Sequence, residues 1–156
     1  MELIEQEVKD IFDSICWKLN RGDVSNYQAS IGLFSSVGES NEMTEQSIIK
    51  NIFGPSTESD FFQECELKEL VLGITECIDW KGDEAVFPNR KYHATAGYAQ
   101  DMAVALSKLR NLFQTASGIC SFVIEKGHPF YPVFWEFAYL VRVPKKNYVL
   151  VGSCSD

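Results

Sequence analysis

Residues 131–143 constrain the fold of this chain more than any other part of its sequence. In an extended strand, successive side chains point to opposite faces. One face would carry Tyr131, Val133, Trp135, Phe137, Tyr139 and Val141, and the other Phe134, Glu136, Ala138 and Leu140. Both faces are almost entirely apolar, which is typical of a central strand buried on both sides. We therefore expect a long strand at 133–143 in the interior of a sheet.

Turn residues and alternating patterns place further strands around this one. Glycine, proline and asparagine predict turns at 126–129 and 144–147. A run rich in β-branched and apolar residues at 64–80, a turn at 81–83 and the segment 84–87 predict an antiparallel hairpin. The other strands that the pattern predicts lie at 26–36, 119–125, 133–143 and 148–152.

Three helices are expected where apolar residues recur with a helical period. The first covers 2–19, and its polar side carries Glu5, Lys9, Asp13 and Asn20. A short helix capped by Thr44 ends before Gly54, and a second long helix spans 98–116. The elements lack the regular alternation of a parallel sheet. We expect an α+β fold, in which an antiparallel sheet of about five to six strands has two long helices and one short helix packed on one face.

The composition favours a single globular domain over residues 1–156, because 46% hydrophobic and 13% aromatic residues suffice for one core. The first residues lack the features of a secretory signal, and no apolar run approaches the roughly 20 residues of a spanning helix. The five cysteines are scattered without a C-x-x-C pair, and the two histidines are far apart. We therefore expect a cytoplasmic protein with reduced thiols, no membrane partner, no metal and no cofactor.

The net charge of −8 is unevenly distributed along the chain. Residues 1–38 carry −3 and residues 85–156 carry +4, whereas residues 39–84 carry −9 from twelve acids and three bases. Such a surface repels nucleic acid and attracts a basic protein, with Trp80 near the predicted hairpin tip as an apolar anchor. The residues expected to contact this partner are Glu58, Asp60, Glu64, Glu66, Glu69, Asp79, Trp80, Asp83 and Glu84.

Glu136 is a lone carboxylate in the long apolar strand, and a buried carboxylate needs a partner. With His128 and Tyr131 it would form a polar site for a small molecule or a reaction, because histidine transfers protons near neutral pH. The alternatives are a structural hydrogen bond from Glu136 to His93, Arg90 or a helix terminus, exposure of Glu136 at a bend of the strand, and a turn-capping role for His128. We assign no catalytic residue, since Cys120 lacks the setting of a nucleophile and no G-x-S-x-G or phosphate-binding loop occurs.

The chain thus combines small size, acidity, an α+β pattern and no catalytic motif with the final segments GHPFYPVFWEFAYLV and YVLVGSCSD. In this overall character it resembles the immunity proteins that protect bacteria from their own contact-dependent or polymorphic toxins. The resemblance implies stoichiometric binding of a cognate toxin domain, often a basic nuclease, and it carries over no contact residues. Two other hypotheses stay open, a site for a small molecule or reaction around Glu136, and a domain that pairs with itself. Both a monomer and a homodimer are therefore considered.

Overall fold

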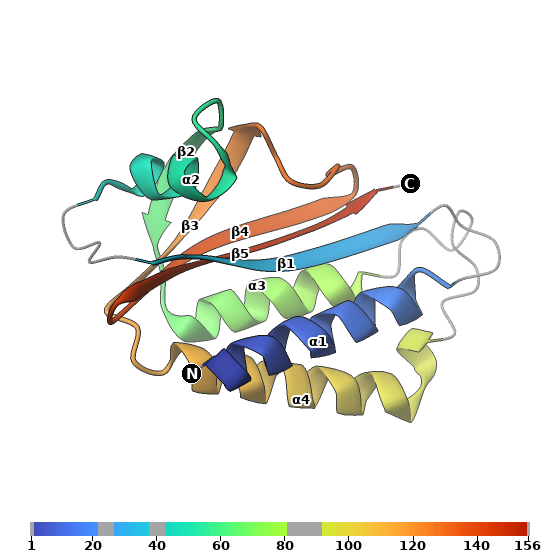
Figure 1. Cartoon of the computed structure of the whole chain (residues 1–156). Helices are drawn as coiled ribbons and strands as arrows, with labels where there is room; N and C mark the ends of the chain where they lie inside the picture. The colour runs from blue at the N-terminus through green and yellow to red at the C-terminus, as the bar shows by residue number, and fades with distance from the viewer. Residues whose placement is uncertain (1, 22–26, 38–42, 81–91, 156) are drawn as a thin grey trace.

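The structure, a computed structural model, describes residues 2–21, 27–37, 43–80 and 92–155. In these residues the fold is α+β, as predicted, with one five-stranded antiparallel sheet (Figure 1). Two of the expected partner-binding residues, Asp83 and Glu84, lie outside this part of the chain, as does the predicted strand at 84–87. None of the described helices combines the length and the apolar character that crossing a membrane requires.

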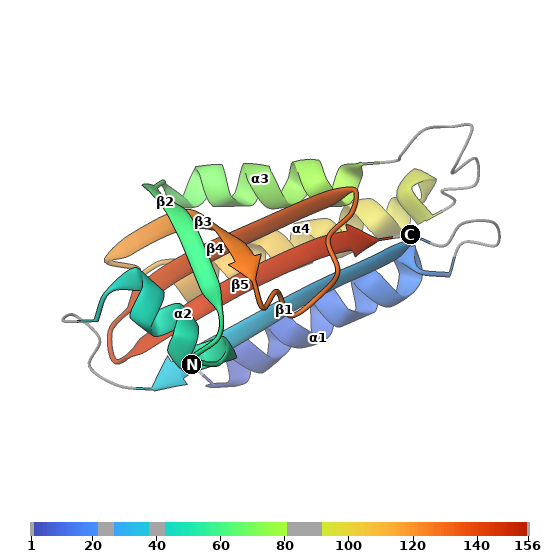
Figure 2. The same ribbon diagram turned by 90° about the horizontal axis from the view of Figure 1, so that it is seen from above.

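The strands of the sheet are β1 (Gln28–Val37), β2 (Glu58–Glu64), β3 (Gly118–Lys126), β4 (Trp135–Val143) and β5 (Lys146–Ser155). They lie in the order β1-β5-β4-β3-β2, and every neighbouring pair is antiparallel (Figure 2). The central position of β4 confirms the prediction made from its two apolar faces. β1, β3 and β5 also confirm predicted strands, with shifts of a few residues at their ends.

Helices α1 (Glu2–Leu19), α3 (Leu67–Asp79) and α4 (Ala96–Phe113) cover one face of the sheet, and α2 (Glu45–Phe53) covers the other (Figure 1). A short 3-10 helix, η1 (Tyr92–Ala94), precedes α4. The two predicted long helices are α1 and α4, and the predicted short helix is α2. The expectation that the helices share one face is wrong for α2.

The two faces of β4 explain why the sheet is covered on both sides. Phe137 and Tyr139 face the larger core, which lies beneath α1, α3 and α4. Ala138 and Leu140 face a smaller core on the opposite side, which α2 closes with side chains such as Ile49, 0% exposed. A strand that is apolar on both faces requires a cover on each, because exposed apolar surface is unfavourable in water.

Most of the segment 64–80 forms helix α3, so the strand predicted there is wrong. Its β-branched residues favour a strand, but its buried side chains follow a helical spacing, at Leu70, Val71, Ile74 and Ile78. Glu66 and Glu69 form a reciprocal capping box at the first turn, where the Glu69 carboxylate accepts a 2.8 Å hydrogen bond from the Glu66 N–H. Periodicity and capping therefore outweigh β propensity in this segment.

β2 has no counterpart among the predicted strands. Its side chains are mostly exposed, and no apolar alternation marks the sequence ESDFFQE. It pairs with β3 at the end of the sheet opposite β1, and its register shifts between Asp60 and Gln63. Pairing with β3, rather than the pattern of its own residues, makes this segment a strand.

Candidate functional site

Five of the eight acidic residues expected to bind a partner gather along one edge of the sheet. We define the acidic edge as Glu58, Asp60 and Glu64 of β2 with Glu66 and Glu69 beside the start of α3. β2 is the outermost strand at this end and leads directly into α3 (Figure 2), and all five side chains are exposed. In the described residues, one ion pair touches this group, between Glu66 and the exposed Lys68 at 3.1 Å. The edge therefore presents mostly uncompensated negative charge.

Phe61 stands in the middle of the acidic edge and is 67% exposed. Its φ of 60° lies in the left-handed region, which costs a residue with a side chain roughly 1–2 kcal/mol. The Asp60 carboxylate accepts a 2.8 Å hydrogen bond from the Phe61 N–H, next to the register shift. The neighbouring Phe62 stacks on Phe122 of β3 at 5.2 Å. The bulge thus holds one aromatic ring against the sheet and leaves the other among carboxylates.

The end of α3 contributes to packing within the molecule. Asp79 is exposed, but its carboxylate accepts a hydrogen bond from the Tyr98 hydroxyl of α4. Burial, together with this bond, raises the pKa of Tyr98, so the hydroxyl stays a donor at neutral pH. Trp80 is half-buried, stacks on Phe134 at 5.0 Å and lies parallel to Tyr27 at 6.3 Å. Both residues hold the end of α3 to its neighbours.

Phe61 therefore presents far more of its ring to solvent than Trp80 does, and sequence reasoning missed it. The available signal was the pair Phe61-Phe62 inside an acidic run. A strand turns neighbouring side chains to opposite faces, so two adjacent aromatic residues at the edge of a sheet seldom both reach the core. The acids themselves were found correctly as exposed groups, because uncompensated carboxylates are rarely buried.

The structure brings His128 and Glu136 together and encloses the imidazole, but Glu136 is exposed, so the expectation of a buried carboxylate in this strand is wrong. His128 Nε2 lies 3.5 Å from Glu136 Oε2, and the His128 side chain is only 10% exposed. The other ring nitrogen, Nδ1, lies 3.0 Å from the backbone nitrogen and 3.2 Å from the carbonyl oxygen of Phe130. Burial lowers the pKa of His128 although Glu136 and Phe130 oppose this effect. The ring is therefore mostly neutral and has protein atoms at both nitrogens. This arrangement indicates a structural role for His128, in which it holds β4 to the segment before it.

Tyr131, the third residue of this alternative site, occupies a different environment. It is 76% exposed, whereas the ring of His128 is enclosed. Tyr131 belongs to the segment 127–134, which joins β3 to β4. This segment is held to β5 by the Cys154 carbonyl, which accepts hydrogen bonds from the N–H groups of Val133 (2.9 Å) and Phe134 (3.0 Å). His128 and Tyr131 thus lie in the segment between β3 and β4, and Glu136 lies in β4, without the three converging on one open site.

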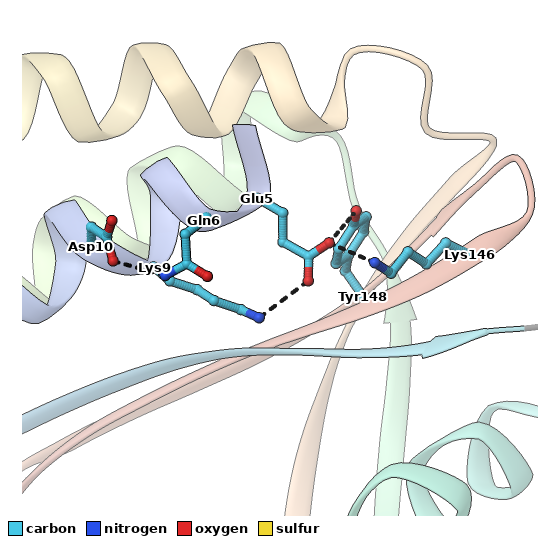
Figure 3. Close-up of polar contacts among 6 residues, drawn as sticks. All are labelled: Glu5, Gln6, Lys9, Asp10, Lys146 and Tyr148. Atoms are coloured by element: carbon cyan, nitrogen blue, oxygen red, sulfur yellow. Dashed lines mark hydrogen bonds and ion pairs between the residues drawn. The ribbon is translucent and has the colours of Figure 1, made fainter. Parts of the chain in front are cut away.

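Glu5, expected on the polar side of the first helix, is instead a buried carboxylate, 7% exposed. Its Oε2 lies 2.6 Å from Lys146 Nζ and accepts a 3.1 Å hydrogen bond from the Tyr148 hydroxyl, while its Oε1 lies 3.2 Å from Lys9 Nζ (Figure 3). Burial alone would raise the pKa of Glu5, but these bonds lower it below its ordinary value. In the sequence, only Lys9 one turn away hints at this cluster.

The fold resembles that of citrus MAF1. Two crystal structures of citrus MAF1 align with 92% and 91% of this chain, and the alignments cover 98% and 96% of the MAF1 chains. The TM-scores are 0.50 and 0.52 and the sequence identities 12% and 14%, so the likeness concerns the fold alone. No model of a protein family matches the sequence, and a search of curated proteins found no relative.

The thiols lie in surroundings that disfavour the thiolate. All five cysteines are free, two of them buried and three half-buried. Burial raises the pKa of Cys16 to about 12 and that of Cys77 and Cys120 to about 11, so these thiols are protonated and weakly nucleophilic at neutral pH. Within the part of the chain that the structure describes, no three His, Cys, Asp or Glu side chains are arranged to hold a metal ion.

Proposed function

We propose that this protein binds a basic protein through the acidic edge and neutralises it, in the manner of the immunity proteins that the sequence resembles. The observation that supports this proposal is the exposed ring of Phe61, which lies within the acidic edge on a backbone of unfavourable φ. An apolar ring within a charged rim is the usual composition of a binding hot spot. A strained residue at a surface is retained more readily where it serves recognition.

The charges and the ring have separate roles in this proposal. Carboxylates of β2 attract the lysine and arginine side chains of the partner and accelerate the encounter, whereas the buried area of one aromatic ring supplies most of the affinity. The cognate partner would be a toxin domain whose active site the bound protein covers. The alternative site at His128 and Glu136 has less support, because both ring nitrogens of His128 lie against protein atoms.

The test begins with co-purification of the tagged protein from its native cells and identification of the bound protein. A toxin is expected to arrest growth when expressed alone and to be harmless when expressed with this chain. Calorimetric titration of the purified proteins then measures the affinity of each variant for the toxin. Phe61→Asn should weaken binding at least about tenfold, whereas Tyr131→Asn, which removes an equally exposed aromatic ring elsewhere, should not.

Charge reversal on β2 tests the electrostatic contribution to association separately from the contribution of the Phe61 ring. Glu58→Lys with Glu64→Lys should slow association and reduce its dependence on salt. Glu2→Lys with Asp10→Lys changes the net charge equally on exposed positions of α1, at the opposite end of the sheet, and should affect association much less. The proposal fails if the identified partner binds Phe61→Asn as tightly as the unchanged protein, or if both reversals have the same effect.

A further inference from the structure

The outer edge of β1 is a second candidate surface, at the end of the sheet opposite the acidic edge. Among the described residues, β1 pairs with β5 alone. The side chain of Asn20 occupies the start of this edge, because its amide donates to the Ala29 carbonyl at 3.0 Å and accepts from the Ala29 N–H at 2.6 Å. Asn20 thus imitates a neighbouring strand at one residue.

The two bonds of Asn20 also fix which backbone groups of β1 point outward. In an antiparallel pair, alternate residues turn their N–H and C=O groups towards the partner strand and away from it. Since Ala29 faces outward, so do Ile31, Leu33 and Ser35. The N–H of Ile31 lies against the Cys16 thiol. In the described residues, the outward groups of Leu33 and Ser35 have no hydrogen-bond partner.

A groove runs beside these groups, between β1 and one stripe of α1. Two adjoining hollows of about 210 Å³ and 380 Å³ lie along it, and Asp13 and Ile31 line both. The helix runs along the open edge of β1 and extends outward beyond it (Figure 2). A strand added to β1 would therefore rest on α1. The residues of α1 that line the two hollows are Gln6, Val8, Lys9, Phe12, Asp13, Cys16 and Trp17, and Asn20 follows directly after the helix.

The chemistry of the groove indicates a cationic occupant. Asp13 is exposed and has no hydrogen bond or ion pair with any described residue, and partial desolvation together with the charge of Asp10 raises its pKa. A lysine or arginine placed next to Asp13 would reverse this unfavourable effect. The cations already present beside the groove have partners of their own, because Arg21 lies over the ring of Trp17 at 4.0 Å and Lys9 lies 3.2 Å from Glu5. A second copy of the chain is a poor occupant, because each copy carries a net charge of −8.

We propose that an extended segment of a partner protein adds to the open edge of β1 as a further strand and places a lysine or arginine beside Asp13. Backbone bonds to Leu33 and Ser35 would supply affinity, and Asp13 would supply selectivity for the cation, as side-chain contacts do in other cases of strand addition. The free length from Ile31 to Ser35 suits a strand of about five residues. This surface is independent of the acidic edge, so either proposal stands without the other.

The first experiment uses two acetylated, amidated hexapeptides as probes, Thr-Val-Lys-Val-Thr-Val and the same peptide with glutamine in place of lysine. Amide hydrogen exchange followed by NMR reports on β1. In the free protein, Leu33 and Ser35 should exchange much faster than Gly32 and Phe34, which bond to β5. A saturating concentration of the lysine peptide should slow amide exchange at Leu33 and Ser35 at least about tenfold. Exchange at Gly32 and Phe34 should change little.

The second experiment separates the charge from the backbone. Asp13→Asn should weaken binding of the lysine peptide about tenfold, so that it binds no better than the glutamine peptide. Asp10→Asn, one turn away and outside the hollows, should leave binding of the lysine peptide unchanged. Two further peptides carry N-methyl groups on alternate residues, one at the odd and one at the even positions. Only one of these two patterns blocks the N–H groups that face β1, so one peptide should lose binding and the other should keep it. That measurement leaves the protein unaltered, so misfolding cannot explain its result.

Three outcomes overturn this proposal. One is equal affinity for the lysine and glutamine peptides, or no binding at about 1 mM peptide. Another is binding that neither pattern of N-methylation disturbs, because the peptide then does not form a strand. The last is a dimer in sedimentation whose free form already protects Leu33 and Ser35, since a second copy would then fill the edge.

Discussion

Glu5 holds the first helix to the last hairpin, because one buried carboxylate receives Lys9, Lys146 and Tyr148. Glutamine at this position leaves a neutral group against two ammonium groups. We expect Glu5→Gln to lower the free energy of unfolding by about 1–3 kcal/mol near neutral pH, as measured by chemical denaturation. Glu2→Gln on the exposed side of the same helix is the control and should change stability by less than about 0.5 kcal/mol.

The lowered pKa of Glu5 also fixes the sign of a pH dependence. At acid pH the unfolded chain takes up a proton on this residue before the folded protein does. The contribution of Glu5 is therefore complete above its ordinary pKa of 4.5 and is lost as the pH falls through the lower folded value. The stability difference between the unchanged protein and Glu5→Gln should shrink in that range. A difference that stays constant down to about pH 3 would contradict this assignment.

Gly73 allows α3 to approach β4 closely, because a Cβ at this position would overlap the Tyr139 hydroxyl. Alanine would gain roughly 1 kcal/mol of helix propensity, but the rigid ring leaves little room. We expect Gly73→Ala to cost about 1–3 kcal/mol overall. Tyr139→Phe in the same chain should recover much of that loss, as a double-mutant cycle would measure. Strictly additive effects would show that the hydroxyl is not the obstacle.

At the scale of elements, α2 is the described helix that covers the second face of the sheet. Ile49 is fully buried there against β4 and its neighbours, whereas Ile52 of the same helix is half-buried. Thermal and denaturant unfolding should show that Ile49→Ala costs about 2–4 kcal/mol and Ile52→Ala less than half as much. Equal losses would mean that α2 acts through its helicity rather than through its apolar face.

The elements that the sequence predicts well are those whose burial follows one clear period. α1, α4 and β4 each carry an unbroken apolar pattern over many residues, and their positions match the prediction. The sequence of α3 predicts a strand because its valine, isoleucines and threonine have β propensity. The signals for a helix are a capping box at its start and the helical spacing of its buried residues. β2 was missed because an edge strand with exposed side chains has no apolar period at all.

The candidate sites show a similar division. Exposure of the acids on β2 follows from their charge. The contact between His128 and Glu136 was expected because Glu136 was predicted to be buried, whereas its side chain is 45% exposed. The outward position of Phe61 depends on a bulge, which arises from pairing with β3. The surroundings of Glu5 depend on Lys146, 141 residues away. Such features require the tertiary arrangement.

In the whole molecule, the ends of the chain depend on each other. β1 pairs with β5, and α1 supplies side chains to the larger core against both strands. A chain that begins at residue 21 should therefore keep much of its far-ultraviolet circular dichroism but lose cooperative thermal unfolding. A synthetic peptide of residues 2–19 should restore the transition. Cooperative unfolding of the shortened chain by itself would show that α1 is dispensable to the core.

The two candidate surfaces lie at opposite ends of one sheet, on β2 and on β1. The two surfaces share no residue, so two partners could bind at once. Their electrostatics differ as well, because the acidic edge acts over a distance and the β1 groove requires direct backbone contact. Salt should therefore weaken the first association more than the second.

The amide of Asn20 has a further consequence for how this protein behaves when concentrated. Fibril growth requires a sheet edge long enough for identical strands to add repeatedly in register. β1 is ten residues long, but Asn20 withdraws its first outward position, at Ala29, and Cys16 covers part of the next. What remains admits one short guest strand and offers a poor template for a growing stack. The side chains of Asn20 and Cys16 thereby shorten the part of this edge to which identical strands could add.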